Sequence, residues 1–281
     1  IRPLKQCLAA NEVSEIYGIL NGTTNYILSR MKREGLGFDE ALAEAQEKGY
    51  AEQDPTADIK GHDAGRKIAI LSSIAFESHV PYTDIYTEGI ENIDYIDILY
   101  AQEIESSIKL IARAKRQDEG VFAMVTPMLV SNYSPLADVE DVFNAIMVKG
   151  DAIGDVMFYG QGAGKLPTAS AVVGDIIDVA KHLKGAKVEP DGDGNTLTVL
   201  SIDDFESKRL IRLRSDDIDN LKKTVEDVFL GSTIISLDHP ETHNEIAVLT
   251  PPIAEGQIDV LLDSLRRKLD KFEMISSMRV E

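Results

Sequence analysis

The spacing of apolar residues along the chain changes period near residue 21. Over residues 13–20 the apolar side chains are dense and bounded by polar ones, which predicts a β-strand. After Asn21-Gly22 the apolar period lengthens to that of a helix, so a strand, a turn and a helix follow one another. Further helices are predicted over about 39–48, 61–76 and 94–105.

Two β-rich segments, at 108–115 and 121–130, occupy the middle of the chain. The polar turn 117–120 separates them, and this arrangement predicts an antiparallel pair. Strand-like segments at about 142–149 and 155–159 follow, and glycine-rich residues then lead into a helix over about 167–183. We therefore expect an α/β (α+β) domain with a mixed sheet over residues 1–185.

The C-terminal part of the chain has a different order of elements. Strands are predicted at about 210–213, 232–238 and 244–250, with a last strand that ends at Val280. Apolar stripes predict one helix after the first strand, through Ile218 and Val228, and another over about 258–269. The order βαββαβ is the ferredoxin-like plan. The turn-rich residues 186–206 then form a linker to a second domain at 207–281.

Charge and composition exclude several classes of protein. The net charge of −19 argues against binding nucleic acid through phosphate neutralisation, and against an anionic membrane surface. No apolar run approaches the roughly 20 residues of a membrane-spanning helix. The single Cys7 excludes an internal disulfide framework, which suits a reducing cytoplasm.

Residues 49–67 are the most acidic stretch next to a helix start. Carboxylates recur between residues 52 and 63, and two basic residues then precede an apolar run. A solvated loop does not need this density of charge, so the stretch predicts a site for a small polar molecule. The carboxylates are Glu52, Asp54, Asp58 and Asp63, and the two basic residues are Arg66 and Lys67.

Asp63 and Lys67 are four residues apart and therefore meet on one helix face. The alternative is an exposed ion pair of little consequence. Because Ile70 and Ile74 continue the same stripe, we expect the pair to lie where a buried face begins. A lysine held partly out of water beside an aspartate can act as a general acid–base. The carboxylates of Glu52, Asp54 and Asp58 would then meet an ammonium group of the substrate.

The same stretch also offers ligands for a metal ion. Its oxygen and nitrogen donors are Glu52, Asp54, Asp58, His62 and Asp63. Their spacing matches no common metal motif, and Lys67 would repel a divalent cation. We therefore favour the lysine interpretation and predict no metal site.

Residues 160–168 contain three alternate glycines before Pro167. The spacing is neither that of a Walker loop nor that of the dinucleotide-binding fingerprint. The glycines let the backbone approach a partner closely, and Pro167 is typical of a helix start. The alternative is a tight strand-to-helix turn with no ligand.

Several long motifs, in order, resemble the homoserine dehydrogenase family over the whole chain. The resemblance implies interconversion of L-homoserine and L-aspartate 4-semialdehyde with NAD or NADP. It also implies a cytoplasmic enzyme of threonine and methionine biosynthesis that forms a homodimer or a higher homo-oligomer. The matching residues are 18–26, 49–52, 54–58, Gly61, Asp63, Ala64, Arg66, Lys67, 162–164, 167–172 and Asp175.

The resemblance also assigns roles to individual residues. It implies that Lys67 is the general acid–base, and that Glu52 and Asp63 contact the substrate with Asp58 in support. Gly164 would approach the cofactor. The remaining pocket-lining residues implied by the family pattern are Gly22, Thr23 and Tyr50.

The chain departs from the family pattern at two places. The family has a dinucleotide-binding domain before this region, so we expect the chain to be a piece of a longer polypeptide that is inactive alone. Residues 207–281 resemble an ACT domain, which binds an amino-acid effector, but the turn at 214–220 lacks the Pro and Gly of that family. The module then serves either an effector or subunit contact. The rival function is a non-catalytic amino-acid-sensing or structural homologue.

Overall fold

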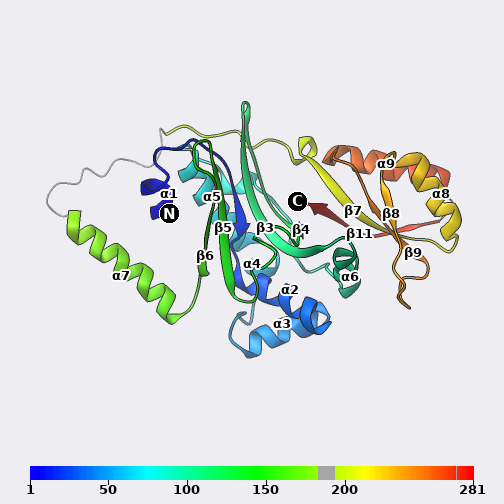
Figure 1. Cartoon of the computed structure of the whole chain (residues 1–281), viewed down its shortest axis with the longest axis horizontal. Coiled ribbons are helices and arrows are strands. Elements are labelled where there is room, and N and C mark those ends of the chain that lie inside the picture. The colour runs from blue at the N-terminus through cyan, green and yellow to red at the C-terminus, as the bar shows by residue number, and fades with distance from the viewer. Residues whose placement is uncertain (183–193, 270) are drawn as a thin grey trace.

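A computed structural model describes residues 1–182, 194–269 and 271–281, which form one mixed sheet with helices packed on it (Figure 1). The helices are α1 (Arg2–Gln6), α2 (Gly22–Glu34), α3 (Phe38–Glu47), α4 (Thr56–Ile59), α5 (His62–Ala75), α6 (Tyr95–Glu103), α7 (Lys165–His182), α8 (Ile218–Val228) and α9 (Glu255–Lys268), with 3-10 turns at Tyr82–Asp84 and Ile202–Asp204. The strands are β1 (Val13–Ile19), β2 (Tyr86–Thr87), β3 (Ser106–Gln117), β4 (Gly120–Ser131), β5 (Phe143–Gly150), β6 (Gly154–Gln161), β7 (Glu206–Arg214), β8 (Thr233–Ile235), β9 (Glu245–Leu249), β10 (Ile253–Ala254) and β11 (Glu273–Val280).

The main sheet has the order β6-β5-β1-β3-β4-β11-β7-β9-β8, with β2 beside β4 and β10 beside β7. Its first five strands pair antiparallel, and β3 and β4 form the predicted hairpin, closed where Gln117 pairs with Gly120. The predicted α/β class with a mixed sheet is therefore confirmed. The short elements α4, β2 and β10 were not predicted, because two to four residues carry no readable period.

The C-terminal strands have the order β11-β7-β9-β8, and α8 and α9 pack on them. Their shared core contains Leu221 and Val225 from α8, Leu262 and Leu265 from α9, and Ile211 from β7. This is the ferredoxin-like plan that the sequence predicted.

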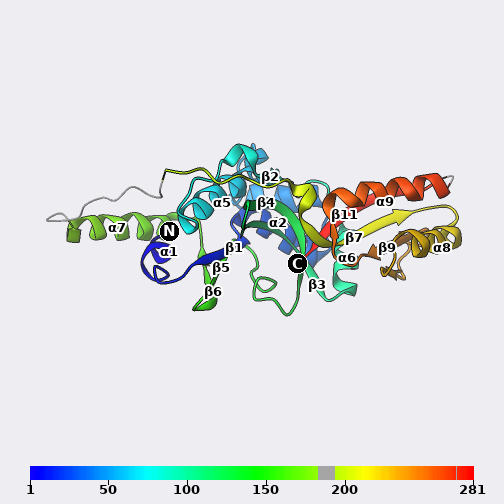
Figure 2. The same ribbon diagram turned by 90° about the horizontal axis from the view of Figure 1, so that it is seen from above.

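One strand pair joins the two parts of the sheet. The last strand, β11, pairs parallel with β4, with Arg279 opposite Met128 and Val280 opposite Leu129. The chain from residue 194 first crosses the N-terminal part (Figures 1 and 2), where the backbone N–H groups of Leu197 and Leu200 donate to His79 and Val121 at 2.8 and 2.9 Å. The division into 1–185, 186–206 and 207–281 stays a prediction, since residues 186–193 lie outside the described residues.

Helix α7 extends away from the sheet, as both ribbon views show (Figures 1 and 2). Several of its apolar side chains are exposed: Leu166 is 78% exposed, Ile176 62% and Val179 63%. A contiguous exposed apolar surface is typical of a contact with another protein surface. No helix within the described ranges is long and apolar enough to cross a membrane.

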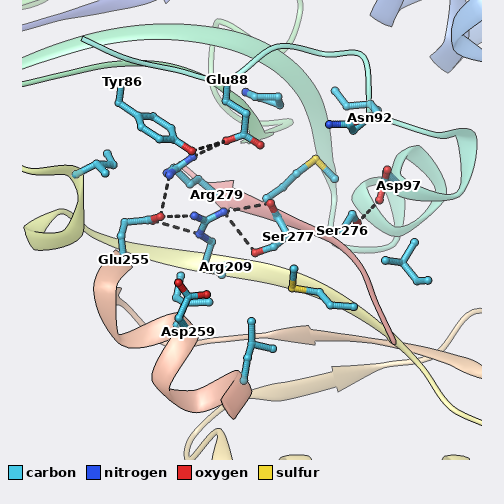
Figure 3. A pocket seen from close by; sticks show the side chains of 18 of the residues that line it. Tyr86, Glu88, Asn92, Asp97, Arg209, Glu255, Asp259, Ser276, Ser277 and Arg279 are labelled. Carbon is cyan, nitrogen blue, oxygen red and sulfur yellow. Dashed lines mark hydrogen bonds and ion pairs between the residues drawn. The ribbon is translucent and has the colours of Figure 1, made fainter. Parts of the chain in front are cut away.

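A buried arginine fastens the C-terminal part of the sheet to α6. The Arg212 guanidinium lies 2.6 Å from Asp97 and 2.8 Å from Asp94 at the start of α6, and 2.7 Å from Glu245 on β9. Ser276 on β11 also donates to Asp97, at 2.5 Å (Figure 3). Burial raises the pKa of Asp97, while the charge of Arg212 opposes that shift.

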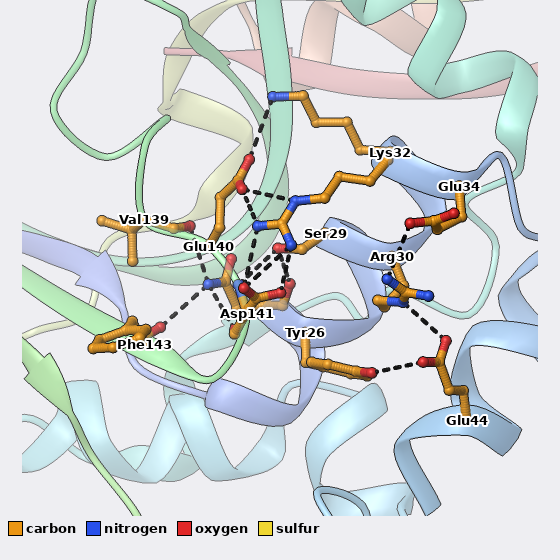
Figure 4. Close-up of polar contacts among 12 residues, drawn as sticks. Tyr26, Ser29, Arg30, Lys32, Glu34, Glu44, Val139, Glu140, Asp141 and Phe143 are labelled. Atoms are coloured by element: carbon orange, nitrogen blue, oxygen red, sulfur yellow. Dashed lines mark hydrogen bonds and ion pairs between the residues drawn. The ribbon is translucent and has the colours of Figure 1, made fainter. Parts of the chain in front are cut away.

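A buried lysine fastens the loop between β4 and β5 to α2. The Lys109 ammonium on β3 donates to the Val139 carbonyl at 2.5 Å and to Asn25 Oδ1 at 3.3 Å. Asn25 Nδ2 donates in turn to the carbonyls of residues 139, 141 and 143. Figure 4 shows this loop against α2, where the Asp141 N–H donates to Ser29 Oγ at 3.0 Å. Burial lowers the pKa of Lys109 to about 8.

We predict that Arg212→Met lowers the free energy of unfolding by about 3–5 kcal/mol, because it leaves Asp97 and Glu245 buried without their cation. Denaturant unfolding of both proteins measures this difference. Arg214→Met is the matched control: Arg214 pairs with the same Glu245 but is 47% exposed, so its loss costs about 1 kcal/mol or less. Equal losses in the two variants would contradict the assigned role of Arg212.

We predict that Lys109 makes stability rise with pH from about 8 to about 10.5, its ordinary value. In this window the unfolded chain keeps the proton that the folded chain has released. Urea unfolding at several pH values should show a gain of up to about 3 kcal/mol that is absent in Lys109→Met. Lys115→Met, at an exposed position of the same strand, should keep the gain; an unchanged pH profile in Lys109→Met would contradict the prediction.

Candidate active site

The start of α2 is the point where three segments of the chain meet. Asn21 is its N-cap: the Asn21 Oδ1 atom accepts from the Thr24 N–H at 2.9 Å. The Asn21 Nδ2 group donates to Asp58 Oδ1 at 2.7 Å and to Asp63 Oδ2 at 2.9 Å. One buried amide therefore holds both carboxylates against the end of β1.

Lys67 completes this cluster. Its ammonium lies 2.6 Å from Asp63 Oδ2 and donates to the Leu20 carbonyl at 3.0 Å. The predicted pairing of Asp63 with Lys67 is confirmed. We call Asn21, Asp58, Asp63 and Lys67 the polar cluster.

The prediction that Lys67 lies where a buried apolar face begins is wrong. Ile70, which was expected to continue a buried stripe, is 52% exposed, and the Lys67 side chain is 49% exposed. Helix α5 buries instead the face that carries Ala64, Ile68 and Leu71. The isoleucine spacing alone did not show which face of α5 meets the sheet, so the prediction chose a neighbouring stripe.

The acidic stretch divides into separate parts. Asp54 accepts from the Thr56 N–H at 3.1 Å and from Thr56 Oγ1 at 2.6 Å, and these bonds lower the pKa of Asp54. Asp54 thus stabilises the turn before α4. Glu52 is exposed, and no contact of its carboxylate with the polar cluster is found among the described residues.

The histidine weighed as a metal ligand lies elsewhere. His62 Nδ1 is 3.4 Å from the Tyr82 hydroxyl. Over the described ranges, no three His, Cys, Asp or Glu side chains are arranged to hold a metal ion.

Thr23 and Tyr50 contact each other, while their place in a substrate pocket stays a prediction. The Thr23 hydroxyl donates to the Tyr50 carbonyl at 2.7 Å, which fastens the acidic stretch to α2. The Tyr50 ring is 45% exposed and packs on Tyr26, with ring centroids 4.9 Å apart. A cavity of about 360 Å³ lies beside them. It is lined by Tyr26, Arg30, Lys48, Tyr50, Asp141, Val142 and Phe143.

Glu44 on α3 fixes one wall of this cavity (Figure 4). Its carboxylate lies 2.7 Å from the Lys48 ammonium and accepts from Arg30 Nε at 2.9 Å and from the Tyr26 hydroxyl at 3.0 Å. The bond from Lys48, and then that from Arg30, lower the pKa of Glu44 to about 2. The carboxylate therefore holds the three side chains in place at neutral pH.

Asn144 on β5 connects the start of α2 with the glycine-rich turn. Asn144 Nδ2 donates to the Ile19 carbonyl at 3.1 Å. A Cβ on Gly162 would lie 2.6 Å from Asn144 Oδ1, and one on Gly22 would lie 2.8 Å from the Val142 carbonyl. Gly22 therefore needs glycine, since the backbone blocks a side chain there, whereas a side chain at Gly162 would displace Asn144. Gly164 follows in this exposed turn with φ +116°.

The sequence predicted only a turn at Asn21 and gave no prediction for Asn144. A signal existed for Asn21, since an Asn directly before a helix start is a preferred N-cap. Asn144 lies in a strand, where a single polar residue has no local signature. The polar cluster places the Lys67 ammonium and the carboxylates of Asp58 and Asp63 beside the N-terminus of α2. This arrangement suits a small ligand that carries an amine and a hydroxyl or carbonyl group.

Comparisons with known proteins identify the family of the chain. A family model described as homoserine dehydrogenase matches residues 1–177. A homoserine dehydrogenase of Synechocystis is 38% identical over 299 residues, which covers 100% of this chain and 68% of that protein. The enzyme of Mycobacterium leprae is 50% identical over 187 residues, or 65% of this chain and 42% of that protein.

Solved structures of homoserine dehydrogenases also resemble this chain. The homoserine dehydrogenase of Thiobacillus denitrificans superposes with a TM-score of 0.88 at 34% identity, over 100% of this chain and 67% of that one. The S. aureus enzyme gives 0.78 at 32% identity, over 97% and 66%. The chain thus spans about two thirds or less of the length of these relatives. On the family model and these similarities, the chain belongs to the homoserine dehydrogenase family.

Proposed function

We propose that the chain is the substrate-binding part of an enzyme that interconverts L-homoserine and L-aspartate 4-semialdehyde with NAD or NADP. The observation that carries the proposal is the polar cluster, which lies within the residues that match the family.

In this proposal Lys67 moves the proton. As a neutral amine it accepts the hydroxyl proton of homoserine, and as an ammonium it returns a proton to the carbonyl oxygen of the semialdehyde. Asp63 and the Leu20 carbonyl hold the nitrogen in position. Asp58 and Asp63 attract the ammonium group of the substrate, with Glu52 closing from the exposed side. Gly22, Thr23 and Tyr50 line the space around it.

The cofactor, when bound, takes up or returns the hydride. The glycine-rich turn fits its approach: nothing lies within 4 Å of a Cβ built on Gly160, and only Pro167 lies near one on Gly164. The turn also leads into the N-terminus of α7, and helix N-termini commonly bind phosphate groups. One structural neighbour is described as a hyperthermophilic archaeal homoserine dehydrogenase mutant in complex with NADPH, with a TM-score of 0.55 at 28% identity.

The exposed apolar side of α7 supports a larger assembly. Ile176 and Val179 are more than half exposed in this chain, and an exposed apolar patch of this kind is typical of a contact with another protein surface. We propose that the rest of a longer polypeptide or a second subunit does so in a homo-oligomeric enzyme. The single Cys7, exposed and free, is consistent with a cytoplasmic location.

We propose that residues 207–281 are an ACT-like module. The ferredoxin-like strand order supports it. The turn between β7 and α8 is held by its own contacts: Ser215 Oγ donates to the Lys271 carbonyl at 3.0 Å, and Asp217 caps α8 by accepting from the Asn220 N–H at 3.1 Å. An amino-acid effector or a subunit contact would use this turn.

We predict that Lys67→Ala in the intact enzyme lowers kcat for homoserine oxidation by about 10²–10⁴, because the proton acceptor is lost. Steady-state kinetics with NAD or NADP measure it. Lys60→Ala, which removes an exposed lysine of the same stretch, should leave kcat within about twofold. A loss below tenfold in Lys67→Ala would make Lys67 a structural residue.

We predict that residues 1–281 alone do not oxidise homoserine, because the sequence contains no dinucleotide-binding fingerprint. Absorbance of the reduced nicotinamide measures turnover. The intact enzyme in the same assay is the positive control, and a cooperative thermal transition shows that the shorter chain is folded. Turnover above background by residues 1–281 alone would contradict the prediction.

A further inference from the structure

Strands β1, β5 and β6 are neighbours at one edge of the main sheet (Figure 1). β1 ends at Ile19, opposite Ala145 near the start of β5. β6 ends at Gln161, opposite Phe143, the first residue of β5. The end of β1 leads into Gly22 at the start of α2, and the end of β6 leads into the glycine-rich turn. The segment proposed for the substrate and the segment proposed for the cofactor therefore lie at the same end of these strands, on either side of β5.

Asn144, the second residue of β5, contacts both segments through its side chain. Its Nδ2 group donates to the Ile19 carbonyl at 3.1 Å. Its Oδ1 atom would lie 2.6 Å from a Cβ on Gly162 and 3.6 Å from one on Gly22. One half-buried amide thus binds the end of β1 and packs directly against the backbone of the glycine-rich turn.

The backbone that carries Asn144 is fixed on both sides. Asn25 Nδ2 of α2 donates to three carbonyls of the preceding segment 139–143 at 3.0–3.2 Å (Figure 4). The Phe143 ring stacks on Tyr159 of β6, with centroids 5.0 Å apart and planes 5° apart. Because these contacts hold the start of β5 against α2 and against β6, the Asn144 side chain has a fixed place from which to hold the turn.

The reaction proposed above depends on the spacing between the two segments. In homoserine oxidation, C4 of the substrate loses a hydride to the nicotinamide while the hydroxyl proton passes to Lys67. Reacting atoms must approach to about 3–3.5 Å, and a misplacement of about 1 Å can slow such a step about a hundredfold. A residue that fixes one segment relative to the other therefore affects the rate of hydride transfer more than the binding of either molecule.

We propose that Asn144 is a positioning residue of this reaction, which holds the glycine-rich turn at a fixed spacing from the start of α2. The inference rests on the proposed dehydrogenase function and assigns a role to a residue outside the polar cluster. The alternative is an ordinary strand residue whose hydrogen bond contributes about 1 kcal/mol to folding. The alternative predicts a change in stability alone, whereas a positioning role predicts a lower rate in folded enzyme.

Asn144→Ala in the intact enzyme tests this role. We expect kcat for homoserine oxidation to fall about 10- to 100-fold, while the KM for homoserine and the Kd of the reduced cofactor, measured from its fluorescence, change less than about threefold. Homoserine deuterated at C4 should give an isotope effect on kcat at least as large as in the unmodified enzyme, because hydride transfer is the step that slows. An unchanged kcat, a Kd weakened in proportion to the lost rate, or a smaller isotope effect overturns the proposal.

Asn132→Ala is the matched control for the loss of one asparagine hydrogen bond. Asn132 Oδ1 accepts from Ser107 Oγ at 2.8 Å, and Ser107 in turn contacts Lys32 in the last turn of α2, at the opposite end of this helix from Gly22. The midpoint of thermal unfolding should fall by a similar amount in both variants, but kcat of Asn132→Ala should stay within about twofold. An equal loss of kcat in Asn132→Ala would overturn the specific role of Asn144.

Gly162→Ala tests the contact with the turn. The atom in the way of the added methyl group is the end of the Asn144 side chain and not backbone, so the variant should fold with Asn144 displaced. We expect kcat to fall about 10- to 100-fold in Gly162→Ala, but by less than a further threefold or so when this change is added to Asn144→Ala, since the displaced side chain is then absent. Losses that multiply in the double variant would show that the two positions act independently and would overturn the proposal.

The unmodified intact enzyme separates this inference from the proposed function. Absence of homoserine oxidation by the unmodified enzyme would refute the proposed function and, with it, the role of Asn144. Normal turnover by the unmodified enzyme together with normal turnover by Asn144→Ala would overturn the role of Asn144 and leave the proposed function standing.

Discussion

The active-site half of this protein depends on the hydrogen bonds of one buried amide. Asn21 Oδ1 caps α2, and Asn21 Nδ2 holds Asp58 and Asp63. Because the cap fixes the amide, it also fixes which way the two carboxylates point, and Asp63 then orients Lys67. Loss of this amide would leave two carboxylates close together with no shared donor, a costly arrangement at a half-buried position. The positions of Asp58, Asp63 and Lys67, to which we assign substrate binding and proton transfer, therefore depend on one another.

The two parts of the molecule are held together by charge as well as by strand pairing. Strand β11 completes the ferredoxin-like sheet and pairs with β4. Arg212 and Arg279 add buried contacts to Asp97 and Glu88 in the N-terminal part. Buried ion pairs give modest net stability but penalise any arrangement that separates them. The junction between the two parts is thus specific.

Local patterns predicted much of the fold and part of the site. The spacing of four residues was sufficient to bring Asp63 and Lys67 together. The long hairpin and the βαββαβ order followed from strand and turn composition. The same patterns wrongly predicted that Ile70 is buried. Helix α5 has apolar residues on several sides, and their spacing does not reveal which side meets the sheet. They also grouped Asp54 with the substrate residues, although its own turn uses its carboxylate.

By itself, the sequence determined most of the helices and strands, the membership of a family and the pairing of Asp63 with Lys67, because each depends on residues close in the chain or on long motifs. Only the tertiary structure decided that Asn21 reaches Asp58 and Asp63, that Asn144 connects Gly22 with the glycine-rich turn, and that Lys109 is buried. Those contacts join residues tens of positions apart. The strand order that brings them together minimises exposed apolar area and unpaired backbone groups over the whole sheet, which no short window of sequence contains.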